Sequence, residues 1–446
     1  MKDLVIIGAG PGGFDAAIFA KEHGLDVVLI EKHKVGGTCL NYGCIPTKAL
    51  YHNASTIKNM KELDVFGVKV DEFSVDYSVV KARKEAIVSN QVNNILTTIK
   101  KLGIELIEGT AQIKSKNEVE VNGETIKTKN IIIATGSVPK ILQFEGNDLP
   151  IVNDSTGILS LDKMPKKMVI VGAGVIGCEM ATIFNYFDCE ITLVEYEKEI
   201  LPPLDKDIKK RARNLYKRQG ISIYTSSSFK KLIKRDSTYY AVIDSKNKEI
   251  EIETDYVLLS TGRAPNYGGL DLENQGIKLS KTGREVNEFF QTSIDNIYAI
   301  GDITGILMLA HKATYDGYKA VSHILNKDMD INFKQVPSVV FSFPEIATVG
   351  LTEQELEGKV FRTNKYLFKT NAKAECANET DGFIKMIVDE FDILIGCHII
   401  GVHASDLIHE VTSIMYKDIN INEYKNIIHA HPTISEAVGE CIKGFK

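Results

Sequence analysis

Apolar and polar residues alternate along the first 31 residues in a way that predicts one compact unit. An apolar run at 4–7 precedes a glycine-rich turn at 8–13. Apolar residues at helical spacing follow over 14–22, and a second apolar run over 25–30 closes on Glu31. Short apolar runs bounded by glycine predict buried strands, and the spacing between them predicts a helix. The order strand, turn, helix, strand is typical of the βαβ unit of dinucleotide-binding folds.

The same pattern occurs a second time near the middle of the chain. A strand is predicted over 168–171, a glycine turn over 172–177, a helix over 179–187, and a second strand over 191–194 that ends on Glu195. One G-x-G-x-x-G turn is weak evidence for a nucleotide site. Two copies in the same structural context argue against unrelated glycine turns.

The two blocks also share the spacing between glycine and acid. In each, 18 positions separate the last glycine from the acidic residue: Gly13 from Glu31, and Gly177 from Glu195. In such units the backbone approaches a pyrophosphate at a helix N-terminus, and the carboxylate accepts from a ribose hydroxyl. The sequence therefore predicts two dinucleotides, or one dinucleotide and a duplicated scaffold.

Later segments complete an α/β fold. Apolar strands that end in Thr-Gly are predicted at 131–136 and 256–262, and a short strand before an aspartate at 297–302. From about 337 the pattern changes, and we interpret 383–388, where Lys385 stands among apolar residues, as an alternating apolar and polar segment. This alternation predicts an antiparallel sheet with helices. We therefore expect two Rossmann-like dinucleotide-binding domains and a C-terminal α+β domain.

Composition fits a soluble globular protein without affinity for nucleic acid. Of 446 residues, 44% are hydrophobic and 25% charged, and the net charge is −6. The basic run at 209–213 is interpreted as a solvated helix face. Neither a secretory signal nor an apolar stretch of bilayer length is present, so we expect a cytoplasmic protein that does not bind membranes.

Among the seven cysteines, only Cys39 and Cys44 lie close together. The odd number and the scatter of the others suit a reducing compartment. Four interpretations are open for the pair: buried structural thiols, half a metal site, a static disulfide, or a redox pair. A second Cys or His pair at zinc spacing is missing, so we predict no metal site. We expect a helix from about 46 towards 57, whose N-terminus would lower the pKa of a nearby thiol.

The segment around the two cysteines resembles a motif of a known family. Residues 36–48 read Gly-Gly-Thr-Cys-Leu-Asn-Tyr-Gly-Cys-Ile-Pro-Thr-Lys, which is similar to the redox motif of the class I pyridine nucleotide–disulfide oxidoreductases. The resemblance covers the whole chain, including both glycine turns, Gly301-Asp302 and the C-terminal 431–436. It implies a homodimer with an FAD domain over 1–145, an NAD domain over 146–265, a return to the FAD domain over 266–336, and a dimerisation domain over 337–446.

The resemblance implies catalytic roles around a redox disulfide. Cys44 would face the flavin, and Cys39 would be the thiol that meets the substrate. Lys48 would lie near the flavin N5 and pair with Glu179.

The resemblance also implies an acid–base residue. His431, oriented by Glu436 and supplied by the partner subunit, would accept and return the thiol proton, a role that suits histidine near neutral pH. We assign no chemistry to His429, two positions away.

Two sets of cofactor residues follow from the same resemblance. Those expected at FAD are Gly8, Gly10, Gly12, Gly13, Glu31, Lys32, Gly37, Thr38, Lys48, Ala111, Thr135, Gly136, Gly301, Asp302, Leu309, Ala310 and His311. Those expected at NAD are Gly172, Gly174, Val175, Ile176, Gly177, Glu195, Gly262 and Arg263. Glu195 favours NAD over NADP, because its carboxylate repels a 2′-phosphate and no arginine pair follows it.

Substrate class is indicated by smaller features. The stretches 309–313 and 401–410 resemble the lipoamide-using members of the family, Val175 replaces the gating Tyr of glutathione reductases, and the C-terminus lacks the vicinal cysteines of mercuric reductases. We expect oxidation of dihydrolipoamide on a lipoyl carrier of a 2-oxo acid dehydrogenase complex or glycine cleavage system. Two alternatives are an NADH-dependent reductase of another disulfide or peroxide, and a non-catalytic redox-sensing flavoprotein.

Overall fold

The computed structural model describes residues 1–270, 272, 276–277 and 285–446 of the chain. These residues divide into two compact units, each built from three stretches of sequence. The predicted segment 266–336 contains all of the residues outside the described ranges. Unit 1 comprises 1–49, 78–140 and 262–331, and unit 2 comprises 50–77, 141–261 and 332–446.

Unit 1 is organised around a seven-stranded sheet in the order β3-β2-β1-β6-β5-β4, with β17 also paired to β6. The central strands β1, β2 and β6 are parallel, and their apolar side chains form one core with β17. The seven strands of this sheet are β1 (Lys2–Ile7), β2 (Val27–Glu31), β3 (Glu105–Glu108), β4 (Ala111–Ser115), β5 (Glu118–Val121), β6 (Glu124–Ile133) and β17 (Ile297–Ala299). A separate pair joins β7 (Ser137–Pro139) to β16 (Arg263–Pro265).

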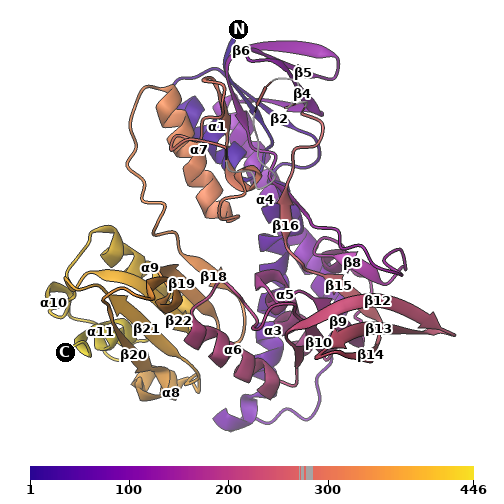
Figure 1. Ribbon diagram of the computed structural model, residues 1–446, viewed down its shortest axis with the longest axis vertical. Helices are drawn as coiled ribbons and strands as arrows, with labels where there is room; N and C mark the ends of the chain where they lie inside the picture. Colours follow the sequence, from indigo (N-terminus) through magenta and orange to yellow (C-terminus); the bar gives the residue numbers. More distant parts are fainter. Residues whose placement is uncertain (271, 273–275, 278–284) are drawn as a thin grey trace. The chain divides into compact units, whose positions relative to one another are not determined.

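Helices α1 (Pro11–Glu22) and α7 (Ala310–Ile324) lie side by side in this unit, as Figure 1 shows. Glycine makes the close approach possible. A Cβ on Gly12 would lie 2.9 Å from the Ala313 carbonyl oxygen, and one on Gly317 would lie 2.9 Å from the Gly12 carbonyl oxygen. The third glycine of the first turn therefore serves helix packing.

The helices of the cysteine segment differ from the prediction. Helix α2 (Gly37–Tyr42) was not expected, and α3 (Cys44–Lys61) begins two residues earlier and ends four residues later than the predicted 46–57. Pro46 is the third residue of α3 and does not delay its start, because the first-turn N–H groups of a helix have no intrahelical acceptor. Helix α4 (Tyr77–Leu102) follows.

Unit 2 holds the second nucleotide-type sheet, in the parallel order β11-β10-β9-β15-β8. Helix α5 (Val175–Tyr186) follows β9 as the glycine turn predicts. The strands are β8 (Val152–Asp154), β9 (Lys167–Val171), β10 (Glu190–Val194), β11 (Ser222–Tyr224) and β15 (Tyr256–Leu259). Three antiparallel strands accompany them, β12 (Ser227–Arg235), β13 (Thr238–Ser245) and β14 (Lys248–Thr254).

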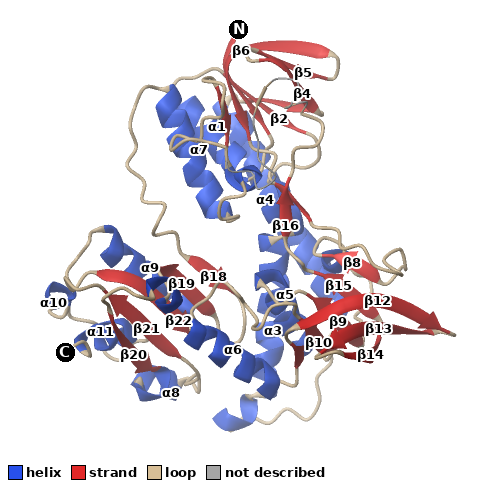
Figure 2. Ribbon diagram, in the orientation of Figure 1, coloured by secondary structure: helices blue, strands red, loops and turns tan. Residues whose placement is uncertain are grey.

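The predicted antiparallel C-terminal sheet with helices is confirmed, in the order β18-β19-β22-β21-β20. Figure 2 shows this sheet with helices α9 (Ala404–Tyr416) and α11 (Glu436–Lys443) close to it. Its strands are β18 (Ser338–Val340), β19 (Ile346–Gly350), β20 (Arg362–Leu367), β21 (Phe383–Val388) and β22 (Leu394–Ile400). The short helices α8 (Ala372–Cys376) and α10 (Ile421–Tyr424) complete this region.

The alternation read in 383–388 does not give β21 a solvent face, because all six residues are buried. The polar member, Lys385, is fully buried, and its ammonium lies 2.9 Å from both carboxylate oxygens of Asp205. Asp207 and Glu353 also accept from it, at 2.7 and 2.5 Å. A buried cation is tolerated only with such partners.

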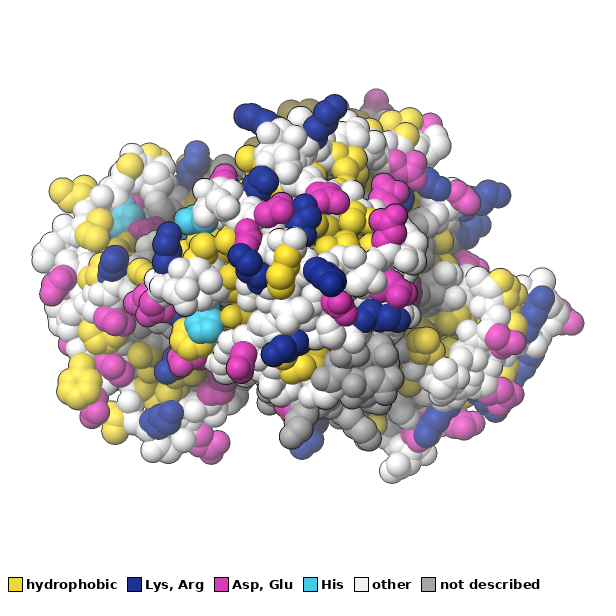
Figure 3. Space-filling view, turned by 90° about the horizontal axis from the view of Figure 1, so that it is seen from above, with side chains coloured by type: hydrophobic (Ala, Val, Ile, Leu, Met, Phe, Trp, Pro, Cys, Tyr) yellow, Lys and Arg dark blue, Asp and Glu magenta, His cyan; other side chains and the backbone are white. Residues whose placement is uncertain are grey.

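The basic run lies on helix α6 (Lys206–Arg218) and is only partly a solvated face. Arg211 pairs with Asp381 at 2.7 Å, and Arg213 pairs with Glu199 at 3.2 Å. On the molecular face in Figure 3, acidic and basic side chains are interspersed. Of the helices that the structure describes, none is long and apolar enough to cross a membrane.

Candidate active site

The two glycine turns have nearly the same internal geometry. Gly8 and Gly172 have φ of +105° and +99°, which favours glycine. A Cβ on Gly13 would lie 1.9 Å from the Gly8 carbonyl oxygen, and one on Gly177 would lie 2.0 Å from that of Gly172. The first and last glycines of each turn are therefore required by the chain itself.

The middle glycines have a different reason. Gly10 and Gly174 have φ of −71° and −74°, which any residue adopts. Apart from its two chain neighbours, no described residue has an atom within 4 Å of a Cβ placed on Gly174, and only Gly37 Cα, at 4.0 Å, approaches one on Gly10. Each stands at the N-cap of α1 or α5 without a side-chain cap. The open space beside free helix N–H groups fits a dinucleotide pyrophosphate.

A glutamate follows or ends the second strand of each βαβ unit, and the two glutamates make the same contacts. Glu31 Oε2 accepts from Ala9 N at 2.7 Å, and Glu195 Oε2 accepts from Ala173 N at 2.6 Å. The other oxygens accept one further backbone N–H, from His33 and from Glu197. A carboxylate oxygen accepts more than one hydrogen bond, so these buried side chains retain capacity for ribose hydroxyls.

The residues expected at FAD all lie in unit 1. Gly37 packs against the first glycine turn, and a Cβ on it would lie 2.7 Å from Gly10 Cα. Thr135 and Gly136 follow β6, and Thr135 Oγ1 donates to the Asn266 carbonyl at 2.7 Å. The others occupy the ends of elements: Lys32 after β2, Thr38 in α2, Lys48 in α3, Ala111 at the start of β4, and Leu309, Ala310 and His311 at the start of α7.

Gly301 and Asp302 form a short helical turn after β17, and a chain of hydrogen bonds fixes the Asp302 carboxylate. Ser137 Oγ donates to Asp302 Oδ2 at 2.5 Å. Arg263 in turn donates to Ser137 Oγ and to the Ser137 carbonyl, both at 2.7 Å. Gly262 and Arg263, expected at NAD, thus belong to unit 1, whereas the six other expected NAD residues lie in unit 2.

The structure brings the two candidate redox cysteines together. Cys39 lies in α2, Cys44 opens α3, and both are partly buried thiols. The hydrogen bond with the Cys44 side chain, followed by burial, raises the pKa of the Cys39 thiol, although Lys48 acts in the opposite direction. The pKa of Cys39 is raised because the second thiol of a close pair must ionise beside the first. The predicted lowering concerns a thiol at the N-terminus of α3, which is Cys44, and it stays a prediction.

Glu179, the expected partner of Lys48, lies in α5 of unit 2 and is buried. Its Oε1 accepts from Phe341 N at 3.0 Å. Lys48 lies one turn into α3 of unit 1, so these two residues belong to different units.

The expected acid–base pair is formed at the C-terminus. His431 Nδ1 lies 3.0 Å from Glu436 Oε1, and the other oxygen of Glu436 accepts from Thr433 N at 2.8 Å. These bonds to Thr433 and His431 lower the pKa of the Glu436 carboxyl. A carboxylate on Nδ1 leaves Nε2 of an exposed imidazole free to exchange a proton.

Sequence reasoning missed two groups beside these residues. Ser137 follows a Thr-Gly pair and gives no sequence signal for its bond to Asp302. His429, assigned no chemistry, lies 2.9 Å from Glu410 Oε1. Its closeness to His431 in sequence was the only available hint.

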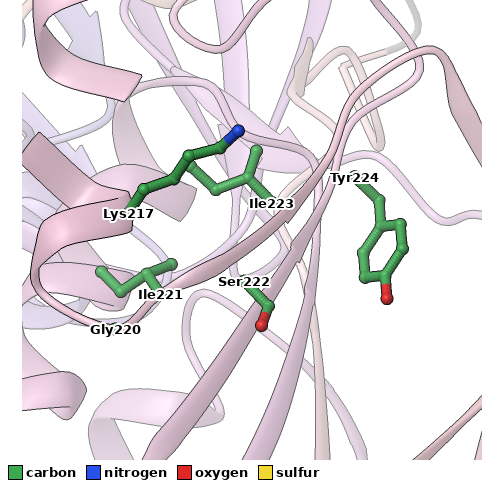
Figure 4. Close-up of a pocket in the computed structure, with 6 residues that line it drawn as sticks. All are labelled: Lys217, Gly220, Ile221, Ser222, Ile223 and Tyr224. Carbon is green, nitrogen blue, oxygen red and sulfur yellow. The ribbon is translucent and has the colours of Figure 1, made fainter. Parts of the chain in front are cut away.

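The described surface also has a hollow of about 420 Å³ at strand β11, lined by Lys217 and 220–224. Its lining residues come from α6, from β11 and from the turn between them, and their side chains do not converge, as Figure 4 shows. Among the residues that the structure describes, no cluster of His, Cys, Asp and Glu could hold a metal ion.

Comparison with known proteins identifies the family. Residues 2–317 match the model of the pyridine nucleotide-disulphide oxidoreductase family, and residues 336–442 match its dimerisation domain. The chain belongs to this family: it is a homodimeric flavoprotein oxidoreductase that uses FAD and NAD.

Two relatives and one solved structure are similar to the chain over nearly its whole length. The chain is 36% identical to dihydrolipoyl dehydrogenase of Bacillus subtilis over 98% of its own length and 97% of that protein. It is 38% identical to dihydrolipoyl dehydrogenase of Chlamydia pneumoniae over 98% and 95%. Among solved structures, the HOCl-induced flavoprotein disulfide reductase RclA from Escherichia coli is similar, with a TM-score of 0.90, 28% identity and complete coverage of both chains.

Proposed function

We propose that this protein oxidises dihydrolipoamide on a lipoyl carrier and delivers the electrons to NAD+. The observation that carries the proposal is the Cys39–Cys44 pair, held against the first glycine turn by the contact of Gly37 with Gly10. A dithiol beside a dinucleotide cradle is the arrangement that thiol–disulfide exchange coupled to a flavin requires. Relatives named dihydrolipoyl dehydrogenase, 36% and 38% identical over nearly the full chain, support the choice of substrate.

The chain's own residues carry out the exchange. His431 of the partner subunit accepts the proton of one substrate thiol, and the thiolate attacks Cys39 Sγ of the oxidised pair. The Cys39–Cys44 bond breaks, Cys44 leaves as a thiolate, and a mixed disulfide forms at Cys39. The second substrate thiol attacks its partner sulfur in the mixed disulfide, releasing cyclic lipoamide and the Cys39 thiol. Two electrons have then passed from substrate to the cysteine pair.

Bound FAD supplies two-electron chemistry between this dithiol and NAD+. The residues that would hold it are the first glycine turn, Glu31 and Asp302. Those for NAD would be the second glycine turn and Glu195, whose carboxylate disfavours a 2′-phosphate. The roles of Lys48 near the flavin and of Glu179 as its partner stay predictions.

The proposed organisation assigns 1–145 and 266–336 to FAD, 146–265 to NAD and 337–446 to dimerisation. The proposed partner is the lipoyl carrier of a 2-oxo acid dehydrogenase complex or glycine cleavage system. The proposed location is the cytoplasm. The scatter along the sequence of the five cysteines outside the pair supports a reducing compartment.

A second candidate is an NADH-dependent reductase of a different disulfide. The similarity to the E. coli disulfide reductase RclA favours it, because the two chains match over their whole length at a TM-score of 0.90. The candidates share the cysteine pair and differ in the substrate that meets it.

The test is turnover of the purified flavin-loaded dimer with free dihydrolipoamide and NAD+, followed as NADH appears. We expect rapid turnover with NAD+, little with NADP+, and loss of at least about 1,000-fold in kcat for Cys44→Ser, since the residues act as a unit. The matched control is Cys376→Ser, because Cys376 is an exposed cysteine outside the pair. A dimer that turns over another disulfide with NADH, and dihydrolipoamide not at all, would establish the second candidate instead.

A further inference from the structure

The loop that carries His431 is fixed by a second histidine–carboxylate pair. His429 Nε2 lies 2.9 Å from Glu410 Oε1 of α9 and 3.3 Å from the Tyr424 hydroxyl of α10. The Tyr424 hydroxyl also donates to Glu410. Only 11% of the His429 side chain is exposed, against 72% for His431. The His429 imidazole is therefore held by its neighbours, whereas the His431 imidazole is exposed on the surface of the chain.

His429 also contacts the helix that carries Glu436. A Cβ on Gly439 of α11 would lie 2.8 Å from His429 Cε1 and 2.9 Å from Nδ1. Gly439 stands three positions after Glu436, almost one helical turn along α11. The imidazole thus ties α9 and α10 to the helix on which His431 depends.

The loop has independent anchors on the far side of His431. Asn371 Nδ2 donates to the Thr433 carbonyl at 3.0 Å, and Thr433 Oγ1 donates to the Ala430 carbonyl at 2.8 Å. His431 is therefore held between two fixed points, the His429 pair before it and Thr433 after it.

We propose that His429, bonded to Glu410 and Tyr424, is a positioning residue that keeps His431 and Glu436 in hydrogen-bonding geometry. The proposal rests on the proposed function, in which His431 is the acid–base residue. Small displacements of such a group are costly, because proton transfer needs the imidazole within hydrogen-bonding reach of the thiol.

Charged groups surround the pair. His429 and Glu436 line the same hollow of about 250 Å³. The charged groups that face His429 from the packed elements are Glu410 of α9, Lys425 after α10, and Glu436, Glu440 and Lys443 of α11, with the Tyr424 hydroxyl of α10. Glu436 is the charged group that faces His431.

The test compares His429→Ala with His429→Gln and His409→Ala in the flavin-loaded dimer. Loss of the anchor loosens His431 from Glu436, and proton transfer requires the imidazole to be held in place. For His429→Ala we expect kcat/KM for dihydrolipoamide to fall about 10-fold, while KM for NAD+ stays unchanged. The glutamine amide can still donate to Glu410, so His429→Gln should restore most of the loss. His409 is exposed on α9 beside Glu410, and His409→Ala should change neither quantity.

A second readout does not depend on turnover. The ring carbon signal of His431 in ¹³C-histidine-labelled dimer, assigned with His431→Ala, should move in His429→Ala and stay at its wild-type position in His409→Ala. An unchanged His431 signal in His429→Ala, with or without loss of activity, would overturn the positioning role. Absence of dihydrolipoamide turnover in the wild type would instead remove the proposed function, and the His431 signal would then decide the role of His429 by itself.

Discussion

Within each glycine turn, the glycines are present for two different physical reasons. Gly13 and Gly177 are demanded by a carbonyl oxygen about 2 Å from their missing Cβ. Gly174 meets nothing of the described chain and has an ordinary backbone conformation. The sequence motif treats these glycines alike, and only the structure separates those that hold the fold from those that leave room for a ligand.

This difference predicts opposite outcomes for two neighbouring substitutions. Gly177→Ala should cost at least about 2 kcal/mol of stability, because a methyl group cannot fit against the Gly172 carbonyl. Gly174→Ala should cost about 1 kcal/mol or less, as a weaker N-cap. It should nevertheless reduce NADH affinity at least about 10-fold, because the methyl group occupies the pyrophosphate space.

The measurements are thermal unfolding of both variants and titration with NADH in the Gly174→Ala protein. Full NADH affinity in Gly174→Ala would show that the open space beside α5 is not where the dinucleotide binds.

Local spacing predicted the cysteine pair and the glycine turns as candidates, and the family resemblance supplied the His431–Glu436 pair. The anchoring of His429 depends on residues that meet only in three dimensions. The hydrogen bonds from Arg263 to Ser137 also join positions 126 apart in sequence. Spacing alone carries no information about such contacts.

At the scale of elements, the strands and helices of the two βαβ units were predictable, because apolar runs and glycine turns are local signals. Strand β21 shows where this reasoning fails. Its sequence was interpreted as alternating, yet Lys385 lies in the core because three carboxylates contact it, two at the start of α6 and one after β19. The partners of a buried charge cannot be read from the strand that carries it.

The buried cluster predicts an unequal response to two lysine substitutions. Lys385→Ala should destabilise the protein by about 3–5 kcal/mol, because it leaves Asp205 buried without its cation. Lys365 of β20 is the matched control, since it contacts Asp207 at 2.9 Å but is partly exposed. Lys365→Ala should cost less than about 1 kcal/mol.

Chemical denaturation of the two variants measures the difference. Equal, small losses for both lysines would mean that the Lys385 cluster contributes little beyond its desolvation cost.

At the scale of the whole molecule, the protein is a homodimer. In the proposed mechanism each active site uses His431 of the partner subunit. A mixture of Cys44→Ser and His431→Ala subunits tests this arrangement. Neither parent should turn over dihydrolipoamide. Subunits exchanged at equal ratio should regain about one quarter of wild-type activity, since half of the dimers are mixed and each has one complete site.

The control is the same mixture without subunit exchange, which should stay inactive. If exchanged mixtures also remain inactive although mixed dimers have formed, His431 acts within its own chain and the proposed mechanism needs revision.

The repeated turn has a consequence for cofactor choice. Gly8 N and Gly172 N each donate to the strand beside them at 2.8 Å, and Ala9 and Ala173 each donate to the closing glutamate. These shared contacts do not distinguish FAD from NAD by themselves. That distinction must therefore come from the surroundings, such as the cysteine segment that packs on the first turn.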